Sequence, residues 1–487
     1  MTLAELLEEV DVEAVRGPLE VTVTDVVSDS RQVRPGAAFF ALSGARADGG
    51  TFARAAVEAG AVAVVGAVGE VEGATAVAVA DPRVALAQAA ARFHGHPARD
   101  LIVAGVTGTN GKTTTTWLID ALAGVPAGVI GTTGARIARE VRPLGYTTPE
   151  APELQRLLAT MRDRGVRCVA MEISSHALAQ RRAWGLELDA AVFTNLTQDH
   201  LDYHGTMDAY LDAKLMLFDG RNGGAGKRTR IAAINADDPA APRVVAAAAR
   251  GGWRTLTYGE VPAADVRIER VEIRPLGLEV RLRERGGRAA DFALPLLGRY
   301  NAWNLAAAWT ATRALGLAAT LDPDPAAVRV PGRLEPVDAG QPFLVVVDYA
   351  HTPDALARAL AAVREHARGR VLLVFGCGGD RDRAKRPLMG RAAAAAADRA
   401  WVTNDNPRSE DPAAIARAIV AGAPGADLTI ELDRRAAIAA ALASARPGDA
   451  VLIAGKGHEI TQTIGDRVTP FDDRAVAREL LGAGGRP

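Results

Sequence analysis

Between residues 101 and 123 the chain combines a strand pattern, a glycine-rich turn and the start of a helix, in this order. Residues 101–106 form a continuous apolar run, which is typical of a strand covered on both faces. The turn reads Gly105-Val-Thr-Gly-Thr-Asn-Gly-Lys-Thr-Thr114, and residues 112–123 show a helical pattern. Such a loop between a buried strand and a helix is typical of phosphate binding in a parallel α/β sheet.

The residue types of this loop fit phosphate chemistry. Glycine lets backbone N–H groups approach phosphate oxygens, and a helix N-terminus favours negative charge. The amine of Lys112 would reach the terminal phosphates, and the hydroxyl of Thr113 would bind Mg²⁺. Val106 stands where the general pattern has its first glycine, and Gly108 supplies the flexibility instead. The expected contacts to a nucleotide phosphate chain are Gly108, Thr109, Asn110, Gly111, Lys112, Thr113 and Thr114.

The length and the alternation of patterns predict an α/β protein of three domains. At 487 residues, about three domains are expected. Short apolar runs alternate with helical patterns, which indicates parallel βαβ units. A helix stop at His94-Gly-His-Pro97 and a proline-rich stretch at residues 322–331 mark boundaries. We predict domains at 1–97, 98–330 and 331–487, the central one with a P-loop-type parallel sheet and the last doubly wound and Rossmann-like.

The same patterns locate the main elements. An antiparallel hairpin is expected at residues 266–295, and a helix that carries Lys214 at 206–218. The expected strands are at residues 24–27, 37–42, 61–65, 76–80, 101–106, 168–173, 190–195, 231–235, 343–347, 371–375, 400–403 and 450–454.

Composition excludes several classes of protein. Lys+Arg 57 against Asp+Glu 58 gives a net charge of -1, so no basic field is available for nucleic acid or an anionic membrane. Cys168 and Cys377 lie far apart, each in an apolar stretch that resembles a strand, which suggests neither a disulfide framework nor a thiolate metal site. No apolar run reaches the roughly 18 residues of a membrane span. We expect a cytoplasmic protein that binds neither nucleic acid nor membrane.

Lysine is scarce, because only five of the 57 basic residues are lysine. A lysine that arginine has not replaced indicates chemistry that needs an amine. We therefore consider that Lys214 reacts with CO₂ to form a carbamate, which would be an additional metal ligand. The alternative is an ordinary solvated lysine on a helix.

Two further residues follow strand patterns on the side of the phosphate loop. Glu172 ends the run at 168–173, and His200 follows the run at 190–195. Residues at the carboxyl ends of parallel strands meet at one edge of the sheet, so both side chains could face a Mg²⁺–phosphate group. The alternatives are a solvated loop glutamate and a structural histidine.

A dense polar cluster follows three strand patterns in the last domain. Its arginines suit a carboxylate, and Glu459 can receive a cation, so the cluster fits a ligand with both carboxylate and ammonium groups. Ordinary turn chemistry explains any one segment alone. The candidate residues are Arg381, Asp405, Asn406, Pro407, Arg408, Gly455 and Glu459.

Taken together, the motifs resemble those of the Mur ligases from about Ser28 to Arg474. The motifs are Gly108-Thr-Asn-Gly-Lys-Thr-Thr114, Met171-Glu-Ile-Ser-Ser-His176, Thr194-Asn-Leu-Thr-Gln-Asp-His200, Asp348-Tyr-Ala-His351, Gly378-Gly-Asp-Arg-Asp382, Asp405-Asn-Pro-Arg408 and Gly455-Lys-Gly-His-Glu459. The resemblance implies a ligase that uses ATP and Mg²⁺ in peptidoglycan precursor synthesis, and we expect a monomer. It would phosphorylate the D-glutamyl carboxylate of UDP-N-acetylmuramoyl-L-alanyl-D-glutamate, and the amine of meso-diaminopimelate would displace phosphate.

The resemblance also implies roles for individual residues. Lys112, Lys214, Glu172 and His200 would be catalytic, and Thr113, Glu172, His200 and the Lys214 carbamate would hold the metal. Asn301, Arg333, Asp348 and His351 would border ATP. The UDP substrate would meet Ser28, Ser30, the loop at residues 45–47, Thr147, Thr148, Ser174, Gln180 and Arg182. The chain departs from related enzymes at Ala45-Arg46, where His-Gln can stand, and at Tyr146, where Asn is common.

The resemblance assigns the amino-acid substrate through Arg408. In the family, Asp-Asn-Pro-Arg accompanies meso-diaminopimelate, whose far end carries a second carboxylate, whereas lysine has only an ammonium there. Three alternatives remain: the lysine-adding ligase of the same family, a folylpolyglutamate-synthetase-like ligase, and a non-enzymatic P-loop switch.

Overall fold

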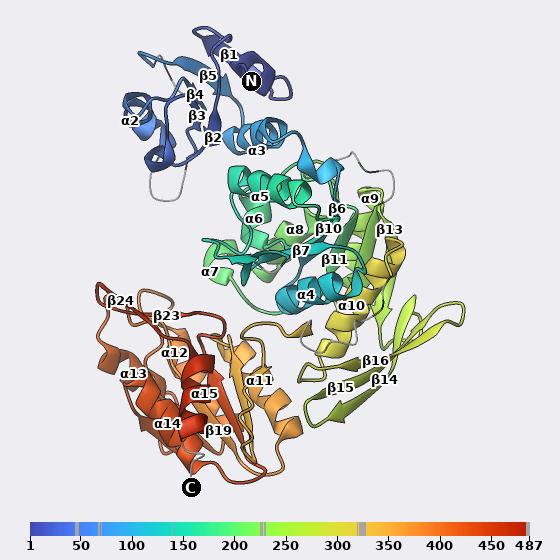
Figure 1. Cartoon of the computed structure of the whole chain (residues 1–487), viewed down its shortest axis with the longest axis vertical. Helices are drawn as coiled ribbons and strands as arrows, with labels where there is room; N and C mark the ends of the chain where they lie inside the picture. Colours follow the sequence, from blue (N-terminus) through green and yellow to red (C-terminus); the bar gives the residue numbers. More distant parts are fainter. Residues whose placement is uncertain are drawn as a thin grey trace. The chain divides into compact units, whose positions relative to one another are not determined.

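The computed structural model describes the chain except residues 44–47, 67, 68, 70, 139, 225, 226, 228, 229, 319, 321–327 and 484–487, and the side chain of residue 483. The loop expected at residues 45–47 and most of the proline-rich stretch at 322–331 therefore lie outside the described residues. The chain forms two compact units, residues 1–267 with 303–321, and residues 268–302 with 322–487 (Figure 1).

The first unit begins with a five-stranded sheet in the order β1-β5-β4-β3-β2. Its strands are β1 (Val12–Arg16), β2 (Asp25–Val27), β3 (Ala37–Phe40), β4 (Ala63–Val65) and β5 (Thr75–Val79), of which only β1 pairs antiparallel. The helices are α1 (Leu3–Leu6), η1 (Ser30–Gln32), η2 (Gly49–Phe52), α2 (Ala53–Glu58) and α3 (Pro82–Phe93). Apolar side chains of α1 and α3 pack on one face of the sheet and those of α2 on the other. All four predicted strands are confirmed.

A larger sheet follows, with strands in the order β13-β12-β11-β6-β10-β7-β8-β9 in the first unit. The parallel strands are β6 (Ile102–Thr107), β7 (Ala127–Gly131), β10 (Cys168–Glu172), β11 (Ala190–Phe193), β12 (Ile231–Asn235) and β13 (Arg254–Gly259). Strands β8 (Gly134–Ile137) and β9 (Glu140–Arg142) pair antiparallel at the edge. The helices are η3 (Pro97–Arg99), α4 (Lys112–Leu122), α5 (Ala151–Asp163), α6 (Ser175–Ala179), α7 (Leu201–His204), α8 (Met207–Leu215), α9 (Ala241–Arg250) and α10 (Asn301–Ala314).

The hairpin predicted at 266–295 consists of three strands. These are β14 (Val266–Arg274), β15 (Gly277–Glu284) and β16 (Ala289–Leu294), and β15 pairs antiparallel with β16. The first two residues of β14 pair parallel with β13. The prediction of one hairpin was incomplete, because a second, two-residue turn separates β14 from β15.

The second unit contains a doubly wound sheet, as predicted, in the order β17-β18-β22-β19-β20-β21. Its strands are β17 (Glu335–Pro336), β18 (Leu344–Asp348), β19 (Val371–Phe375), β20 (Arg399–Val402), β21 (Leu428–Ile430) and β22 (Ala450–Ala454), with a separate hairpin of β23 (Thr461–Ile464) and β24 (Arg467–Pro470). One face packs against α11 (Pro353–His366), α12 (Lys385–Ala396) and α13 (Pro412–Val420), and the other against α14 (Arg434–Ser444) and α15 (Asp473–Ala483).

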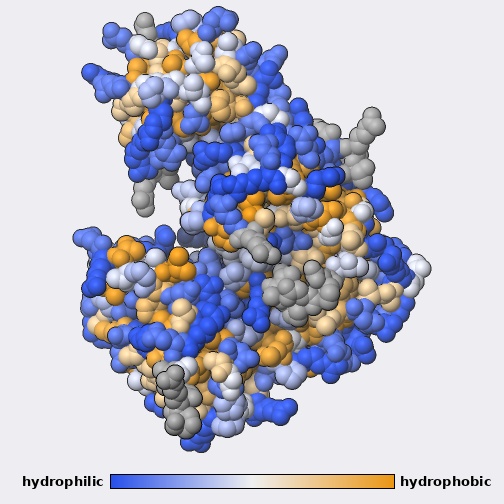
Figure 2. All heavy atoms as spheres, viewed as in Figure 1, coloured by the Kyte–Doolittle hydropathy of each residue, from blue (hydrophilic) through white to orange (hydrophobic). Residues whose placement is uncertain are grey.

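The surface and the cysteines add two observations. Hydrophilic and apolar side chains are interspersed over the face shown in Figure 2. In the described part of the chain, none of the helices has the length and hydrophobicity needed to cross a membrane. Both cysteines are buried and free; Cys168 lies in β10, whereas Cys377 lies two residues beyond β19 and not in a strand as expected.

Candidate functional site

The phosphate loop has the backbone that its glycines predict. It connects β6 to α4, and Gly111 caps α4 with a φ of 85°. A Cβ on Gly111 would lie 2.3 Å from Oδ1 of Asn304, and a Cβ on Gly108, whose φ is 143°, would lie 1.9 Å from Oγ1 of Thr194. Only glycine fits these two positions, so the loop curls closely between β11 and α10.

Hydrogen bonds fix the loop to the end of β11. The backbone N–H of Thr109 donates to the carbonyl of Asn195 at 2.8 Å, and that of Asn110 donates to the Asn195 side chain at 3.0 Å. The Thr194 hydroxyl donates to the carbonyl of Asn110 at 2.6 Å. The segment from Thr194 to His200 therefore holds the phosphate loop in place. It also carries the candidate metal ligand His200.

The amine of Lys112 points back into the loop. Its Nζ donates to the carbonyls of Gly108 and Thr109, both at 2.8 Å. A phosphate group held in such a loop meets this positive charge at the start of a helix. The structure thus brings together the loop, its lysine and the first-turn hydroxyl of Thr113, which is 4% exposed.

Glu172 lies at the carboxyl end of β10, beside β6, with 1% of its surface exposed. Thr132 donates to it twice, from the backbone N–H to Oε1 at 2.8 Å and from Oγ1 to Oε2 at 3.1 Å. A Cβ on Gly131 would lie 2.3 Å from Oε1, so glycine leaves room for the carboxylate. A carboxylate has about four acceptor positions, and further positions stay available for a cation.

His200 belongs to an aromatic cluster with His176, Tyr203, His204 and Tyr210. The rings of His176 and His200 meet edge to face at 4.7 Å, and Tyr203 lies 4.4 Å from His176. Burial and the neighbouring His200 lower the pKa of His176 to about 4. His200 itself keeps 43% of its side chain exposed, so it remains accessible to a ligand.

Lys214, on α8, is 1% exposed, and its Nζ lies 4.3 Å from the centre of the Tyr210 ring. It forms no ion pair with a carboxylate of the described residues. Burial, reinforced by the charge of Lys112, holds the pKa of the Lys214 amine well below its usual value. A buried ammonium without a counter-ion is unfavourable, so burial favours the neutral, nucleophilic form of the amine.

These residues fit a magnesium ion that is bound together with a nucleotide. Within the described residues, no three His, Cys, Asp or Glu side chains gather as a ready metal site. Mg²⁺ prefers oxygen ligands and usually takes several from water and substrate phosphates, with one or two from the protein. The buried hydroxyl of Thr113 and carboxylate of Glu172 supply oxygens of this kind.

Four of the residues expected to meet the UDP substrate, Thr148, Ser174, Gln180 and Arg182, form a connected group in the first unit. Arg182 donates to the carbonyl of Thr148 at 3.2 Å, and its guanidinium lies 4.1 Å from the centre of the Tyr146 ring. Ser174 donates its backbone N–H to the Thr148 hydroxyl at 3.1 Å. Thr147 shares a 3.1 Å hydrogen bond with Thr132, and Gln180 accepts a bond from Arg182.

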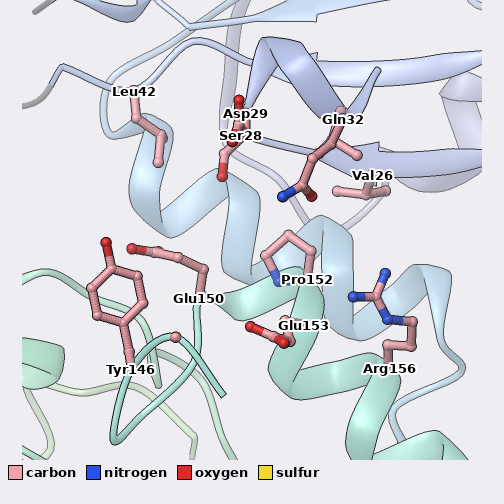
Figure 3. A pocket seen from close by; sticks show the side chains of 12 residues that line it. Val26, Ser28, Asp29, Gln32, Leu42, Tyr146, Glu150, Pro152, Glu153 and Arg156 are labelled. Atoms are coloured by element: carbon pink, nitrogen blue, oxygen red, sulfur yellow. The ribbon is translucent and has the colours of Figure 1, made fainter. Parts of the chain in front are cut away.

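A pocket of about 440 Å³ lies between the first sheet and α5 with the loop before it, all within the first unit (Figure 3). Ser28 lines it, as does Tyr146, whereas Ser30 is not one of its lining residues. The other lining residues include Asp29, Gln32, Glu150, Glu153 and Arg156. These residues were not predicted, because single polar residues in loops and helix starts are common.

The residues expected to border ATP include four in the second unit. Asp348, at the end of β18, accepts the backbone N–H groups of Leu334 and Ala350, and burial raises its pKa. His351 bonds through Nδ1 to the carbonyl of Tyr349 at 2.9 Å, and Arg333 stacks 5.0 Å from the Tyr349 ring centre. Asn301 donates to the carbonyl of Leu297 at 2.7 Å. Their position beside a nucleotide remains a prediction.

The second unit brings two of the predicted amino-acid-binding loops into direct contact. Asn406 donates to Oε2 of Glu459 at 2.8 Å. The fully buried Lys456 donates to the same Glu459 oxygen at 3.2 Å and to Oδ1 of Asn406 at 3.3 Å. Gly455 has a φ of 114°, which other residues rarely adopt, and a Cβ there would lie 3.1 Å from Oδ2 of Asp405. Lys456 was visible as a rare lysine, but its part in this contact was not predicted.

Arg408 connects these loops to the glycine-rich loop after β19. Its Nη1 donates to the carbonyl of Gly379 at 2.7 Å, and its backbone N–H donates to Thr463 in the hairpin β23–β24 at 3.1 Å. The remaining guanidinium N–H groups can still bind a carboxylate. Arg381, on the same loop as Gly379, is exposed and forms no hydrogen bond or ion pair with Glu459 in the described residues.

Three residues at these sites have a left-handed backbone although they are not glycine. They are His200, Asp380 and Arg408, with φ values of 54°, 53° and 52°. This conformation is unfavourable for ordinary side chains and is concentrated at functional loops.

Comparison with known proteins identifies the family. The "Mur ligase family, catalytic domain" model matches residues 22–94, the "Mur ligase middle domain" model 106–312, and the "Mur ligase, glutamate ligase domain" model 332–457. A UDP-N-acetylmuramoyl-L-alanyl-D-glutamate--2,6-diaminopimelate ligase from Geobacillus thermodenitrificans is 48% identical over 461 residues, 93% of this chain and 94% of that protein. The chain belongs to the Mur ligase family. The resemblance inferred from the motifs is confirmed.

Solved structures agree with the fold of a Mur ligase. A structure of a UDP-N-acetylmuramoyl-L-alanyl-D-glutamate--2,6-diaminopimelate ligase covers 100% of both chains at 34% identity and a TM-score of 0.68. A Mycobacterium tuberculosis folylpolyglutamate synthase covers 83% of this Mur ligase and 95% of its own chain, at 20% identity and a TM-score of 0.62. The second likeness shows the fold alone, and the predicted α/β class is confirmed.

Proposed function

We propose that the chain is an ATP-dependent amide ligase that adds meso-diaminopimelate to UDP-N-acetylmuramoyl-L-alanyl-D-glutamate and releases ADP and phosphate. The observation that carries the proposal is the 48% identity, over nearly the whole chain, to a ligase of that name. The phosphate loop and the Arg408–Glu459 region supply the chemistry that such a ligase needs.

The reaction begins with a carboxylate, which is a poor electrophile. Transfer of the γ-phosphoryl group of ATP to the D-glutamyl carboxylate oxygen gives an acyl phosphate and ADP. The neutral amine of the amino acid then attacks the carbonyl carbon, the amine loses a proton, and the C–O bond to phosphate breaks. Gly108 to Thr114 would hold the phosphates, with Lys112 offsetting the charge that develops on them.

The metal would be held by Thr113, Glu172, His200 and the carbamate of Lys214. Bound Mg²⁺ would neutralise phosphate charge and favour the in-line transfer. Lys214 supports this assignment, because burial lowers the pKa of its amine and so favours the neutral form that attacks CO₂, and the resulting carbamate would carry the negative charge that a metal ligand needs.

The second unit would bind the amino acid. Arg408 and Arg381 would bind its distal carboxylate, and Asp405 and Glu459 its ammonium, since Lys456 and Asn406 occupy only one Glu459 oxygen. Ser28, Ser30, Thr147, Thr148, Ser174, Gln180 and Arg182 would bind the UDP substrate, and Asn301, Arg333, Asp348 and His351 would border ATP.

The remaining expectations belong to the same proposal. The domain division at residues 97 and 330 is supported by the three separate family matches. We expect a cytoplasmic monomer whose substrates are small molecules, without a nucleic-acid or membrane partner; the net charge of -1 supports the absence of nucleic acid.

The alternatives are less well supported. The likeness to folylpolyglutamate synthase does not extend beyond the fold. A lysine-adding ligase does not account for Arg408, and a P-loop switch does not account for the amino-acid-binding loops.

Phosphate release by the purified chain tests the proposal. With ATP, Mg²⁺ and UDP-N-acetylmuramoyl-L-alanyl-D-glutamate, release is expected on addition of meso-diaminopimelate and not of L-lysine. Release with lysine alone would retain the ligase but contradict the substrate assignment. No release with either amino acid would contradict the ligase itself and favour the switch.

Replacement of Arg408 tests the amino-acid subsite. Arg408→Asn keeps a residue that tolerates the left-handed backbone but removes the guanidinium. Loss of a charge-assisted hydrogen bond costs about 1.5–3 kcal/mol, so the KM for diaminopimelate should rise roughly 10- to 100-fold. The preference over L-lysine should fall. Arg417→Ala, at an exposed ion pair on α13, is the matched control and should leave both unchanged. An unaltered KM in Arg408→Asn would contradict the assignment.

A further inference from the structure

Arg434, the first residue of α14, has a fully buried side chain. It pairs with the equally buried Asp473 through two hydrogen bonds, from Nε to Oδ1 and from Nη2 to Oδ2, both 2.7 Å. The pair balances the charge, but the other N–H groups of a buried guanidinium also require acceptors.

Those acceptors are backbone carbonyls directly before two amino-acid-binding loops. Nη1 donates to the carbonyl of Asn404 at 3.2 Å, and Nη2 donates to that of Ala454 at 2.9 Å. Asn404 precedes Asp405, and Ala454 ends β22 immediately before Gly455. One side chain is therefore bonded to the starts of both loops.

The two strands that lead to these loops are not neighbours. β19 lies between β20 and β22, so their axes are about 9–10 Å apart in a regular sheet. The two chain segments must converge beyond the end of β19 to reach one guanidinium. Gly376, which follows β19, permits a close approach, because a Cβ there would lie 2.1 Å from the carbonyl oxygen of Thr403.

We propose that Arg434 is a positioning residue for the amino-acid substrate. By bonding the carbonyls of Asn404 and Ala454, it fixes the separation of the two loops and hence that of the Arg408 guanidinium and the Glu459 carboxylate. This inference rests on the proposed function, in which these two groups bind opposite charges of diaminopimelate. A ligand with charges at fixed separation binds tightly only where the protein groups are held at a matching separation.

A second Arg–Asp pair in the same sheet provides a matched control. Arg370 precedes β19 and Asp449 precedes β22, and Nη2 of Arg370 lies 2.7 Å from Oδ2 of Asp449. This pair connects the amino ends of the strands, at the edge of the sheet opposite the amino-acid-binding loops. Its loss should affect stability without affecting the loops.

The test compares the full-length parent with a double variant, Arg434→Met with Asp473→Leu, and with Arg370→Met. The double variant removes both charges together, so that no buried charge is left alone. We expect at least a tenfold higher KM for diaminopimelate, KM values for ATP and the UDP substrate within twofold of the parent, and a lower preference over L-lysine. Arg370→Met should lower Tm but keep the KM for diaminopimelate.

The possible outcomes separate positioning from structural support. A parental KM and preference in the folded double variant would overturn the inference, as would a loss of kcat with all KM values unchanged. If the double variant does not fold, Arg434→Lys decides, because a lysine keeps the charge but lacks the fork that reaches both carbonyls; a parental KM there would overturn it. Failure of the parent to use diaminopimelate would instead contradict the proposed function.

Discussion

Replacing Lys112 with alanine should lower kcat for phosphate release by about 10³-fold, equivalent to about 4 kcal/mol of transition-state stabilisation. The lysine amine lies inside the phosphate loop, 2.8 Å from two of its carbonyls, where it would meet the phosphates of ATP. Without it the developing negative charge would lose this cation. Lys112→Arg should be impaired almost as strongly, because a planar guanidinium cannot reproduce the compact ammonium that bonds the carbonyls of Gly108 and Thr109.

Steady-state phosphate release measures the loss of kcat. Calorimetry measures nucleotide binding by the same variants. Arg243→Ala, which removes an exposed arginine from α9 in the same unit, is the control and should keep the parental rate. A Lys112→Ala variant that retains more than a tenth of the parental kcat would contradict the placement of ATP in this loop.

Replacing Lys214 should lower kcat by about 10²- to 10³-fold while leaving the fold intact or more stable. Lys214→Met has a similar length and removes an amine whose burial is unfavourable, so its Tm should equal or exceed that of the parent. Lys214→Arg should be inactive as well, because a guanidinium cannot form a carbamate. Loss of activity with gain of stability is the result expected of a chemical role and not of a structural one.

Carbon-13 NMR of the parent equilibrated with ¹³CO₂ detects the carbamate directly, and Lys214→Met should lack the signal. In Lys214→Ala, a small carboxylate such as acetate should restore part of the activity by occupying the vacated space. An Arg variant as active as the parent, or a parent without a carbamate signal, would refute the carbamate assignment.

Buried parallel strands and the phosphate loop were predictable from sequence. The bounds of β12, β19 and β22 agree with the prediction, because each strand is covered on both faces and is apolar throughout. The hairpin β23–β24 was not predicted, since its residues are mostly exposed or half-buried and leave no regular pattern. It nevertheless holds the backbone of Arg408 through Thr463.

The sequence indicated residue types at the candidate site but not their mutual arrangement. Asp405, Arg408 and Glu459 follow strand patterns and were selected for that reason. Arg434 was not, because an arginine at the start of an alanine-rich helix normally points into solvent, and only tertiary packing buries it against Asp473. Asn304 was missed for a similar reason, since its approach to Gly111 depends on how α10 packs.

The left-handed backbone of His200, Asp380 and Arg408 implies that thermal stability and activity favour different residues at these three positions. Each such residue raises the free energy of the folded state by about 1 kcal/mol relative to glycine. Directed evolution for heat resistance alone would therefore favour glycine at these positions and remove the imidazole and the guanidinium to which we assign a part in ligation, together with the carboxylate of Asp380. A heat-resistant catalyst has to gain its stability elsewhere, for example at Gly482 in α15, where an added methyl group would meet nothing within 4 Å.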